Sequence, residues 1–529
     1  MIAHFRNPEP LADDPAAEPA AWDFAQIAKY HRHLSAATAG REVEDKLWSD
    51  LDMELVFRRL DQTATPLGQQ VLYHQIRTWE SDPQTLAQQP RLRETLTENP
   101  GTVPALREKM QGLAASDGYR IIDLLFNPSM FAAGLLVFAQ VMAVALLVVL
   151  LLCFVNFNFV FVLITLALAN LVLSRKYESF VFGHATVLLQ LNALLNVAVG
   201  LGEAGLAPAA EPVQKLAATA GFSRRLAAKL HWQLVDKSRQ PELVAMLFTY
   251  LNVFFLFELI ACLRSLRELN RHQAVLLEIY AAVGTLDATL AVVNFLAAQP
   301  HVCVPVIADE AVLTLEDFYH PLTTAPVFNS IKTGESLLIT GSNMAGKTTF
   351  SKGVALNLLF ARTLHFCFAR AVVMPPLKVM TSIHRVDLIE DHKSYFMVEV
   401  EEIRRLLELS QDPASRHLFV IDEIFRGTNP TERLAAAAAV LNFLGRRSLV
   451  IVTTHDTLLA SLLDQPYTRF HFTEHMQDGK LQYDYLLKPG LASGGNAIRL
   501  LEQATYPAEV VRAAHQFVEQ LADRHNLRP

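Results

Sequence analysis

Eight residues in the second half of the chain, Gly341 to Thr348, constrain the fold most strongly. They read GSNMAGKT and fit G-x-x-x-x-G-K-[ST], a glycine-rich loop that wraps nucleotide phosphates. The apolar run Ser336–Thr340 before the loop predicts a buried strand, and the amphipathic stretch from Thr348 to about Arg362 predicts a helix. Loop N–H groups and the helix N-terminus then point into one concavity, which suits an anion. The alternative is a glycine-rich turn that carries a lysine by chance.

The residue types in this loop predict a triphosphate site. Gly341 and Gly346 allow the backbone to approach the phosphates closely. Lys347 is expected to reach the β- and γ-phosphates, and the hydroxyl of Thr348 is expected to bind Mg²⁺. The other loop residues predicted to bind the cofactor are Ser342, Asn343, Met344, Ala345 and Thr349.

Two later strands carry the groups expected for hydrolysis. The apolar run His417–Ile421 ends in Asp422, which is predicted to hold Mg²⁺, and Glu423, which is predicted to orient or deprotonate the attacking water. The run Ser448–Thr453 leads to His455, which is predicted to donate a hydrogen bond to the γ-phosphate. Such strands, alternating with helices, predict a parallel sheet with its catalytic groups at the carboxyl ends of the strands.

Several segments of the chain resemble the MutS family. The loop GSNMAGKTT, with Asn-Met before its second glycine, is similar to that family's phosphate loop. Further similar segments are SYFMVE ending at Glu399, DEIFRGTNPTE from Asp422, VTTHD ending at Asp456 and KPGLASGGNAIRLLEQATYP from Lys488. Leu47–Leu72 and Leu277–Leu296 are similar to the start and the last helix of the family's helical core domain. Phe425 departs from the pattern, because the family usually has glycine there, and Asn429–Glu432 replaces the usual run that follows.

The resemblance implies an α/β P-loop ATPase domain of the ABC type with a parallel-rich sheet, which uses ATP and Mg²⁺ and follows an all-α core and lever domain. It also implies a homodimer with composite sites, in which Ser394 reaches the γ-phosphate held by the other subunit; the alternative is a solvated loop serine. The family stacks the adenine on an aromatic or histidine side chain, and Tyr485 matches by spacing. The alternation of Tyr483 and Tyr485 also fits an ordinary edge strand. His320 is expected to be structural.

A second feature is a stretch of 51 residues, Leu124–Ser174, without a single Asp, Glu, Lys or Arg. It divides near Asn156 into two apolar runs, each close to the ~20 residues that a spanning helix needs. Arg175 and Lys176 follow at once, as is usual at a cytoplasmic helix end. These patterns predict a transmembrane helical hairpin with both flanks on the cytosolic side. The alternative is a pair of buried core helices.

Two other apolar runs are less extreme. Leu243–Phe257 is followed by charges at helical spacing and predicts a core or membrane-adjacent helix, with a third span as the alternative. Ala185–Gly200 contains Gln190, Asn192 and Asn196 and predicts a buried lever or packing helix. The four cysteines are scattered without a CxxC motif, which predicts no disulfide framework and no zinc site, and favours a reducing compartment.

The predicted organisation is a mobile tail (1–22), a helical core in two parts (23–125 and 177–300), the membrane hairpin (126–176), the ATPase domain (301–515) and a C-terminal tail (516–529). We expect a membrane-anchored ATPase whose homodimer changes shape with ATP and acts on the hairpin or an unknown protein partner. The expected location is the cytoplasmic membrane, with the ATPase domain in the cytosol, or else the cytoplasm.

A DNA-binding protein for mismatched or branched duplexes is the second hypothesis. The net charge of −7 and the absence of a segment for a mismatch-reading domain disfavour it. A transporter-like ATPase ranks third.

Overall fold

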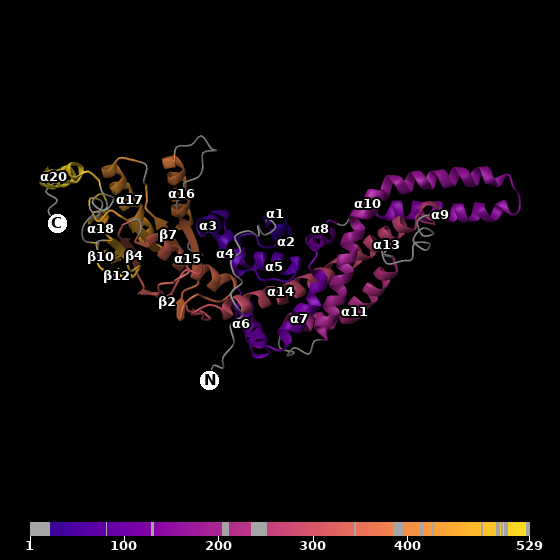
Figure 1. Ribbon diagram of the computed structural model, residues 1–529, viewed down its shortest axis with the longest axis horizontal. Coiled ribbons are helices and arrows are strands. Elements are labelled where there is room, and N and C mark those ends of the chain that lie inside the picture. The colour runs from indigo at the N-terminus through magenta and orange to yellow at the C-terminus, as the bar shows by residue number, and fades with distance from the viewer. Residues whose placement is uncertain are drawn as a thin grey trace.

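The computed structural model describes residues 22–80, 82–127, 132–203, 211–233, 251–342, 345–383, 395–412, 416–425, 428–477, 480–492, 498, 501 and 506–524. The chain forms an elongated molecule with a sheet-containing domain at one end, helices in the middle and a helical hairpin at the other end (Figure 1). The predicted N-terminal tail, apart from Trp22, lies outside the described residues.

The middle of the molecule is helical. Its helices are α1 (Phe24–Ile27), α2 (Lys29–Leu34), α3 (Asp45–Asp50), α4 (Met53–Leu60), α5 (Pro66–Ile76), α6 (Pro83–Glu98), α7 (Thr102–Met110), the 3₁₀ turns η1 (Gln111–Leu113) and η2 (Ser116–Arg120), α8 (Ile121–Phe126), α11 (Glu211–Gln233), α13 (Phe257–Arg271) and α14 (Gln273–Ala297). These elements surround the long, largely buried α14, which passes through the middle of the molecule (Figure 1).

Helix α14, which contains the segment Leu277–Leu296, packs directly on α5, which contains the end of the segment Leu47–Leu72. Glycine at position 284 permits the contact, because an added Cβ would lie 2.4 Å from Val71 Cγ2. Asp287 of α14 is 1% exposed and accepts hydrogen bonds from the backbone N–H of Thr65 at 2.8 Å and its hydroxyl at 2.6 Å. Burial raises the pKa of Asp287. The first turn of α5 is therefore tied to the middle of α14.

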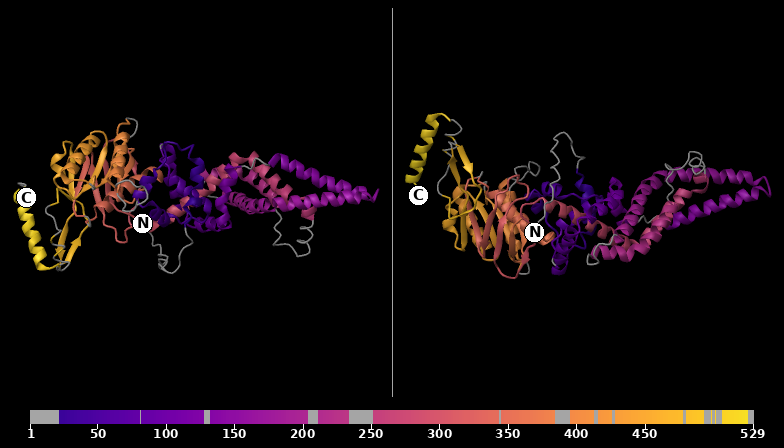
Figure 2. Two further views of the ribbon diagram at one scale, coloured as in Figure 1. Left: turned by 90° about the horizontal axis from the view of Figure 1, so that it is seen from above. Right: turned by 60° about the horizontal axis from the view of Figure 1, so that its bottom comes forward.

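The apolar stretch forms an antiparallel helical hairpin. Helix α9 (Ala132–Cys153) and the first part of α10 (Phe159–Gly202) pack against each other and project beyond the other helices (Figures 1 and 2). Their large apolar side chains point outward: Val141, Val144 and Leu151 of α9 are 58%, 59% and 59% exposed. In their most apolar windows only 17% of α9 and 6% of α10 is buried. Within the described chain the hairpin is therefore not a pair of core helices.

Three helices of the described residues are long and apolar enough to cross a membrane: Gly134–Cys153, Phe159–Gly202 and Gln273–Ala297. The third is α14, and 67% of its most apolar window is buried among the core helices. Most of the run Leu243–Phe257, the alternative third span, lies outside the described residues. The described end of that run is helical until Leu256, whose left-handed φ of 54° interrupts the helix before α13.

Helix α10 is longer than the sequence analysis expects. It continues without a break from Phe159 to Gly202, so it crosses the predicted hairpin boundary at residue 176 and includes the apolar run Ala185–Gly200. Residues 176–185 contain no proline, and a single glycine such as Gly183 is tolerated inside a helix. One rigid rod therefore joins the hairpin to the core. At the base of the hairpin, Asn170 of α10 is fully buried and donates a hydrogen bond to the carbonyl of Phe254 at 2.7 Å.

The domain at the other end contains two main sheets. The larger has the order β12-β9-β4-β8-β7-β6, in which β12 is antiparallel and all other neighbours are parallel. The smaller has the order β1-β5-β2-β3, and β10 and β11 form a separate hairpin. The strands are β1 (Val306–Ile307), β2 (Leu313–Phe318), β3 (Asn329–Thr333), β4 (Ser336–Thr340), β5 (Ala371–Met374), β6 (Lys378–Ser382), β7 (His417–Asp422), β8 (Leu449–Thr454), β9 (Tyr467–His471), β10 (Glu474–Gln477), β11 (Lys480–Tyr483) and β12 (Lys488–Pro489).

Helices cover both faces of the larger sheet. Alternate side chains of β4 point to opposite faces: Leu337 and Ile339 pack with α15 (Lys347–Thr363), whereas Leu338 packs in a cluster with α16, α17 and α18. The bounds of the latter helices are Tyr395–Leu409, Pro430–Gly445 and Leu459–Leu462. This doubly covered, mainly parallel sheet agrees with the predicted α/β class. A last helix, α20 (Ala508–Arg524), crosses the predicted start of the C-terminal tail at residue 516.

Polar contacts join the helical part to the sheet domain close to α15. Lys352 of α15 forms an ion pair with Asp52 at 2.6 Å. At the other end of α15, Arg93 of α6 donates hydrogen bonds to the carbonyls of Leu364 at 2.7 Å and His365 at 2.8 Å. Both ends of α15 are thus held by the helical part of the chain.

Candidate functional site

The loop between β4 and α15 has the backbone that the sequence motif predicts. Gly341 and Gly346 adopt φ values of 144° and 102°, which favour glycine. A Cβ on Gly341 would lie 2.8 Å from the carbonyl oxygen of Phe472. The loop leads directly into the N-terminus of α15 at Lys347, and the N-terminus of a helix favours an anion. Of the predicted loop ligands, Asn343 and Met344 lie outside the described residues.

Lys347 is buried inside the loop, with 2% of its side chain exposed. Its Nζ donates hydrogen bonds to the carbonyls of Gly341 at 2.7 Å and Ser342 at 2.9 Å. The carboxylate of Glu423 lies 3.9 Å from the same nitrogen. The ammonium group is therefore held inside the loop, between the loop carbonyls and the carboxylate predicted to activate water.

Asp422, at the end of β7, links the loop to the neighbouring strand. One oxygen accepts a hydrogen bond from the Thr348 hydroxyl at 2.8 Å, and the other accepts one from the Thr453 hydroxyl. The structure therefore brings together the two residues predicted to bind Mg²⁺. Thr453 was not predicted as part of the site. Thr453 belongs to the site because of the register of the sheet, in which Asp422 of β7 lies opposite Thr453 of β8.

Glu423 follows Asp422 in a left-handed conformation with a φ of 54°. This turn removes Glu423 from the strand and places its carboxylate 3.2 Å from Nδ1 of His455, which lies after β8. The hydrogen bond that His455 donates to the Glu423 carboxylate raises the pKa of His455 above its ordinary value of 6.5, against the opposing effect of partial burial. Glu423 thus lies between Lys347 and His455, the two side chains that the sequence assigns to the γ-phosphate.

We expect the raised pKa of His455 to depend on Glu423. A pKa raised in the folded state means that the charged imidazolium stabilises the fold fully below pH 6.5, and that this contribution is lost as pH rises through the folded value. In Glu423→Gln the pKa of His455 should return toward 6.5. A ¹³C-histidine NMR titration, with the His455 signal assigned from His455→Gln, measures it. An unchanged pKa in Glu423→Gln would show that another group holds the proton.

A second carboxylate, Glu399 of α16, was not predicted as part of the site. It is 3% exposed and accepts a hydrogen bond from the backbone N–H of Phe425. Phe425 has a left-handed φ of 61°, which costs a residue with a side chain about 1–2 kcal/mol relative to glycine. Its ring lies 6.0 Å from the ring of Phe396. The buried Phe425 ring and the hydrogen bond to Glu399 stabilise the turn after Asp422. The turn therefore forms without the glycine that is usual at this position in the MutS family.

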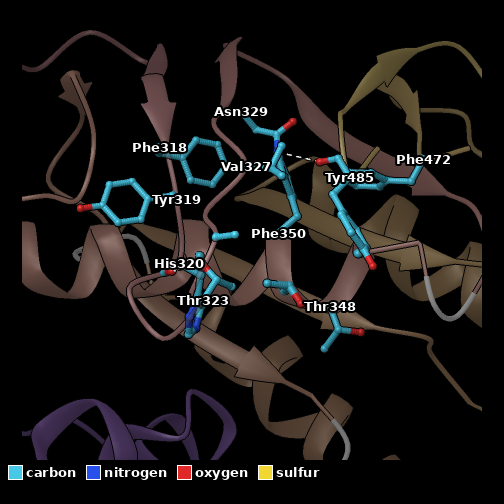
Figure 3. A pocket seen from close by; sticks show the side chains of 14 residues that line it. Phe318, Tyr319, His320, Thr323, Val327, Asn329, Thr348, Phe350, Phe472 and Tyr485 are labelled. Carbon is cyan, nitrogen blue, oxygen red and sulfur yellow. Dashed lines mark hydrogen bonds between the residues drawn. The ribbon is translucent and has the colours of Figure 1, made fainter. Parts of the chain in front are cut away.

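A cavity of about 390 Å³ lies beside the loop (Figure 3). Thr348, Thr349 and Tyr485 contribute to its lining. Tyr485 follows the end of β11, has a left-handed φ of 53°, and lies so close to Gly346 that an added Cβ there would be 3.0 Å from the tyrosine ring. Asn329 fixes this turn, because its side chain donates to the carbonyl of Tyr485 at 3.0 Å and accepts from the N–H of Leu487 at 2.8 Å.

The two tyrosines therefore have different surroundings: Tyr483 is the last residue of strand β11, whereas Tyr485 lines the cavity. His320 lies at the opposite side of the cavity (Figure 3). Burial lowers the pKa of His320 to about 4, and its Nδ1 accepts a hydrogen bond from the N–H of Leu322 at 3.3 Å. These contacts agree with a structural histidine. Ser394, predicted to act across a dimer, lies outside the described residues, so its role stays a prediction.

The sheet domain is similar in sequence to a known protein family. Residues 337–522 match the family model described as MutS domain V. A protein named DNA mismatch repair protein MutS from Chloroflexus aurantiacus is 33% identical over 279 residues, which cover 50% of this chain and 28% of that protein. A protein of the same name from Rhodopirellula baltica is 30% identical over 48% of this chain and 30% of its own length. Another from Thermus thermophilus is 33% identical over 39% of this chain and 26% of its own length. The match thus spans less than a third of each relative. Residues 337–522 of this chain therefore form a domain of the MutS domain V family.

Proposed function

We propose that this chain is a Mg²⁺-dependent ATP hydrolase that works as a homodimer and is anchored to a membrane by the α9–α10 hairpin. One observation carries the proposal: a MutS domain V and an outward-facing apolar hairpin lie at opposite ends of one elongated molecule (Figure 1). ATP binding is proposed to close two such domains on each other, and hydrolysis to reopen them. The hairpin, an attached protein partner or both would receive the motion.

The nucleotide part of the proposal rests on the arrangement around the loop. The loop N–H groups and Lys347 suit the β- and γ-phosphates, and Glu423 is placed to accept a proton from water near Lys347. The Thr348 hydroxyl and the Asp422 carboxylate are oxygen ligands of the kind that Mg²⁺ prefers. When bound, Mg²⁺ would neutralise developing charge on the phosphates. Among the described residues no group of three or more His, Cys, Asp or Glu could hold a metal alone, so phosphate and water would complete its shell.

The transmission of motion is supported by the contacts of α15. This helix begins at the phosphate loop, and Lys352–Asp52 and the two Arg93 hydrogen bonds fasten it to the helical part of the chain. Burial lowers the pKa of Arg93 to about 10, which still leaves it charged at neutral pH. Its charge is favourable beside the carboxyl end of α15. Helix α10 then runs unbroken from the core into the hairpin. A shift of the loop therefore has a continuous rigid route to the hairpin.

The cavity beside the loop is proposed to hold the adenine against Tyr485. Stacking of a base on an aromatic ring contributes about 1–3 kcal/mol, so we expect Tyr485→Ala to weaken ATP binding by roughly 5- to 150-fold. Tyr506→Ala, which removes an exposed tyrosine outside the cavity, is the matched control and should bind normally. Equilibrium binding of a fluorescent ATP analogue measures both. Equal affinity in the two variants would remove Tyr485 from the base site.

The membrane part of the proposal rests on length and exposure. Helix α9 has 22 residues, which at ~1.5 Å per residue extend about 33 Å, enough for a hydrocarbon core of ~30 Å. Phe154, Val155 and Phe157 at the tip are 85%, 82% and 77% exposed. An apolar surface of this extent seldom faces water in a soluble monomer. Lipid covers such a surface without any change of the described fold.

A second candidate function is DNA binding, because the relatives are named DNA mismatch repair proteins. A net charge of −7 provides no general attraction to phosphate backbones. Mobility shifts with homoduplex, mismatched and branched DNA at several salt concentrations distinguish the two functions. Tight binding that weakens steeply with salt would favour the DNA-binding function over the membrane-linked one.

The activity itself is tested with the full chain purified in detergent. We expect release of phosphate from ATP only when Mg²⁺ is present, with loss of the activity in EDTA and recovery on adding Mg²⁺. The dependence of specific activity on protein concentration reports the dimer, because a composite site requires two chains. Phosphate release that continues in EDTA would contradict the assigned roles of Thr348 and Asp422.

A further inference from the structure

Two cysteines that are far apart in the sequence face each other in the fold. Cys303 and Cys367 form an isolated antiparallel bridge in which each backbone N–H bonds to the other's carbonyl, at 3.1 Å and 2.9 Å. Residues paired in this way have Cα atoms about 5.5 Å apart and side chains on the same face. Disulfides span Cα separations of about 4.4–6.8 Å. The Cα separation is therefore within disulfide range, and the Cβ atoms of such a hydrogen-bonded pair, about 5.5 Å apart, must approach by about 1 Å for the S–S bond to form.

The two thiols differ in a way that suits stepwise oxidation. Cys303 is half-buried, and a hydrogen bond with the Cys367 thiol lowers the pKa of Cys303 against the effect of burial. Cys367 is buried, its pKa is raised, and its Sγ donates to the carbonyl of Asn357 at 3.4 Å. An accessible thiol with thiolate character reacts first with an oxidant, and a buried neighbour then resolves the product.

We propose that Cys303 and Cys367 are a reversible oxidation site of this chain, with a peroxide as the oxidant. The Cys303 thiolate attacks one peroxide oxygen, the O–O bond breaks, and a sulfenic acid forms as water or an alcohol leaves. The Cys367 sulfur then attacks the Cys303 sulfur, forms the S–S bond and releases water. Overall, two thiols lose two protons and two electrons, and one peroxide is reduced. A small dithiol reverses the change by thiol–disulfide exchange.

The position of the pair suggests what oxidation would control. Cys303 lies in the segment that leaves α14 and enters the sheet domain, and Cys367 lies just after the end of α15. The same region contains a ring contact of 6.0 Å between Phe295 of α14 and Phe368. A disulfide would fasten the exit of the core helix to the exit of the helix that begins at the phosphate loop. This consequence rests on the proposed function: we expect oxidation to slow ATP turnover, because the disulfide would restrict the domain motion that turnover requires.

The test uses the full chain in detergent, treated with hydrogen peroxide, denatured, alkylated and digested. We expect a disulfide-linked peptide pair containing Cys303 and Cys367, loss of two of the four alkylatable thiols, and recovery of both with dithiothreitol. Cys303→Ser should form no such link, whereas the matched control Cys153→Ser, which changes a cysteine of the hairpin, should form it normally. Free Cys303 and Cys367 after full oxidation of Cys153 would overturn the proposal.

Turnover is measured on the same samples. A reversible slowing in the wild-type chain and in Cys153→Ser, absent in Cys303→Ser, supports control through the pair. Formation of the linked peptides with unchanged turnover overturns the controlling role and leaves the oxidation site established. If no sample hydrolyses ATP, the proposed function fails, while the linked peptides still decide the oxidation site.

Discussion

Glu423→Gln is expected to reduce ATP turnover by about 10²–10³-fold while ATP still binds, because loss of a general base typically costs 10²–10⁴-fold in rate. The glutamine keeps the size of the side chain, whose carboxylate lies 3.9 Å from Lys347 Nζ and 3.2 Å from His455 Nδ1. The variant should therefore accumulate as an ATP-loaded, closed dimer. Single-turnover phosphate release, together with light scattering in ATP, measures both effects.

Lys347→Ala is the contrasting variant, because it removes the ammonium group that the loop carbonyls hold toward the phosphates. It should lose ATP binding itself, which equilibrium dialysis detects. Lys332→Ala, which changes an exposed lysine of β3, is the matched control and should resemble the wild type. Normal hydrolysis by Glu423→Gln would show that another residue activates the water.

Four aspartates on the outer face of α9 are expected to abolish membrane insertion. Val141, Val144, Val148 and Leu151 are all about half or more exposed and lie at helical spacing on one face. An aspartate near the centre of a spanning helix costs about 2.5–3.5 kcal/mol, so four of them exceed what the remaining apolar residues recover. After detergent removal in the presence of liposomes, the wild-type chain should float with the lipid and the variant should remain in the aqueous fraction.

The control for this variant carries four aspartates at exposed apolar positions away from the hairpin: Leu55, Leu458, Leu462 and Val510. It should float like the wild type, because these side chains lie on the helical core and the sheet domain. Flotation of the α9 variant with the lipid would show that the hairpin does not hold the chain in the bilayer. Retained ATP binding in both variants would show that the sheet domain is intact.

Local signals in the sequence predicted the phosphate-loop region closely. Strand β4 spans Ser336–Thr340 as predicted, and α15 begins at Lys347 within one residue of the expectation. The loop glycines, Asp422 and Glu423 are fixed by motifs in which neighbours in the chain are also neighbours in space. The turn at the hairpin tip, near Asn156, follows in the same way from a break in an otherwise apolar run.

The remaining features depend on contacts between segments that are distant in the chain. Thr453 joins the site because β7 and β8 pair in one particular register, and Glu399 joins it because α16 packs beside the turn at Phe425. The cysteine spacing gave no sign that the backbones of Cys303 and Cys367 pair, because this bridge joins two segments that are distant in the chain. The sequence analysis did not predict that α10 continues beyond Ser174, because the composition changes there from apolar to mixed. The residues that follow contain no helix-breaking proline, so the helix continues.

Fractionation of the expressed full chain decides whether the α9–α10 hairpin holds the proposed ATPase on a membrane, as we propose. Membranes are washed with alkaline carbonate, which removes peripheral proteins, and the pellet and supernatant are probed for the chain. If the hairpin spans the bilayer, the chain stays in the pellet and enters solution only with detergent. Release of the chain into the carbonate supernatant, as a monodisperse protein that needs no detergent, would contradict it.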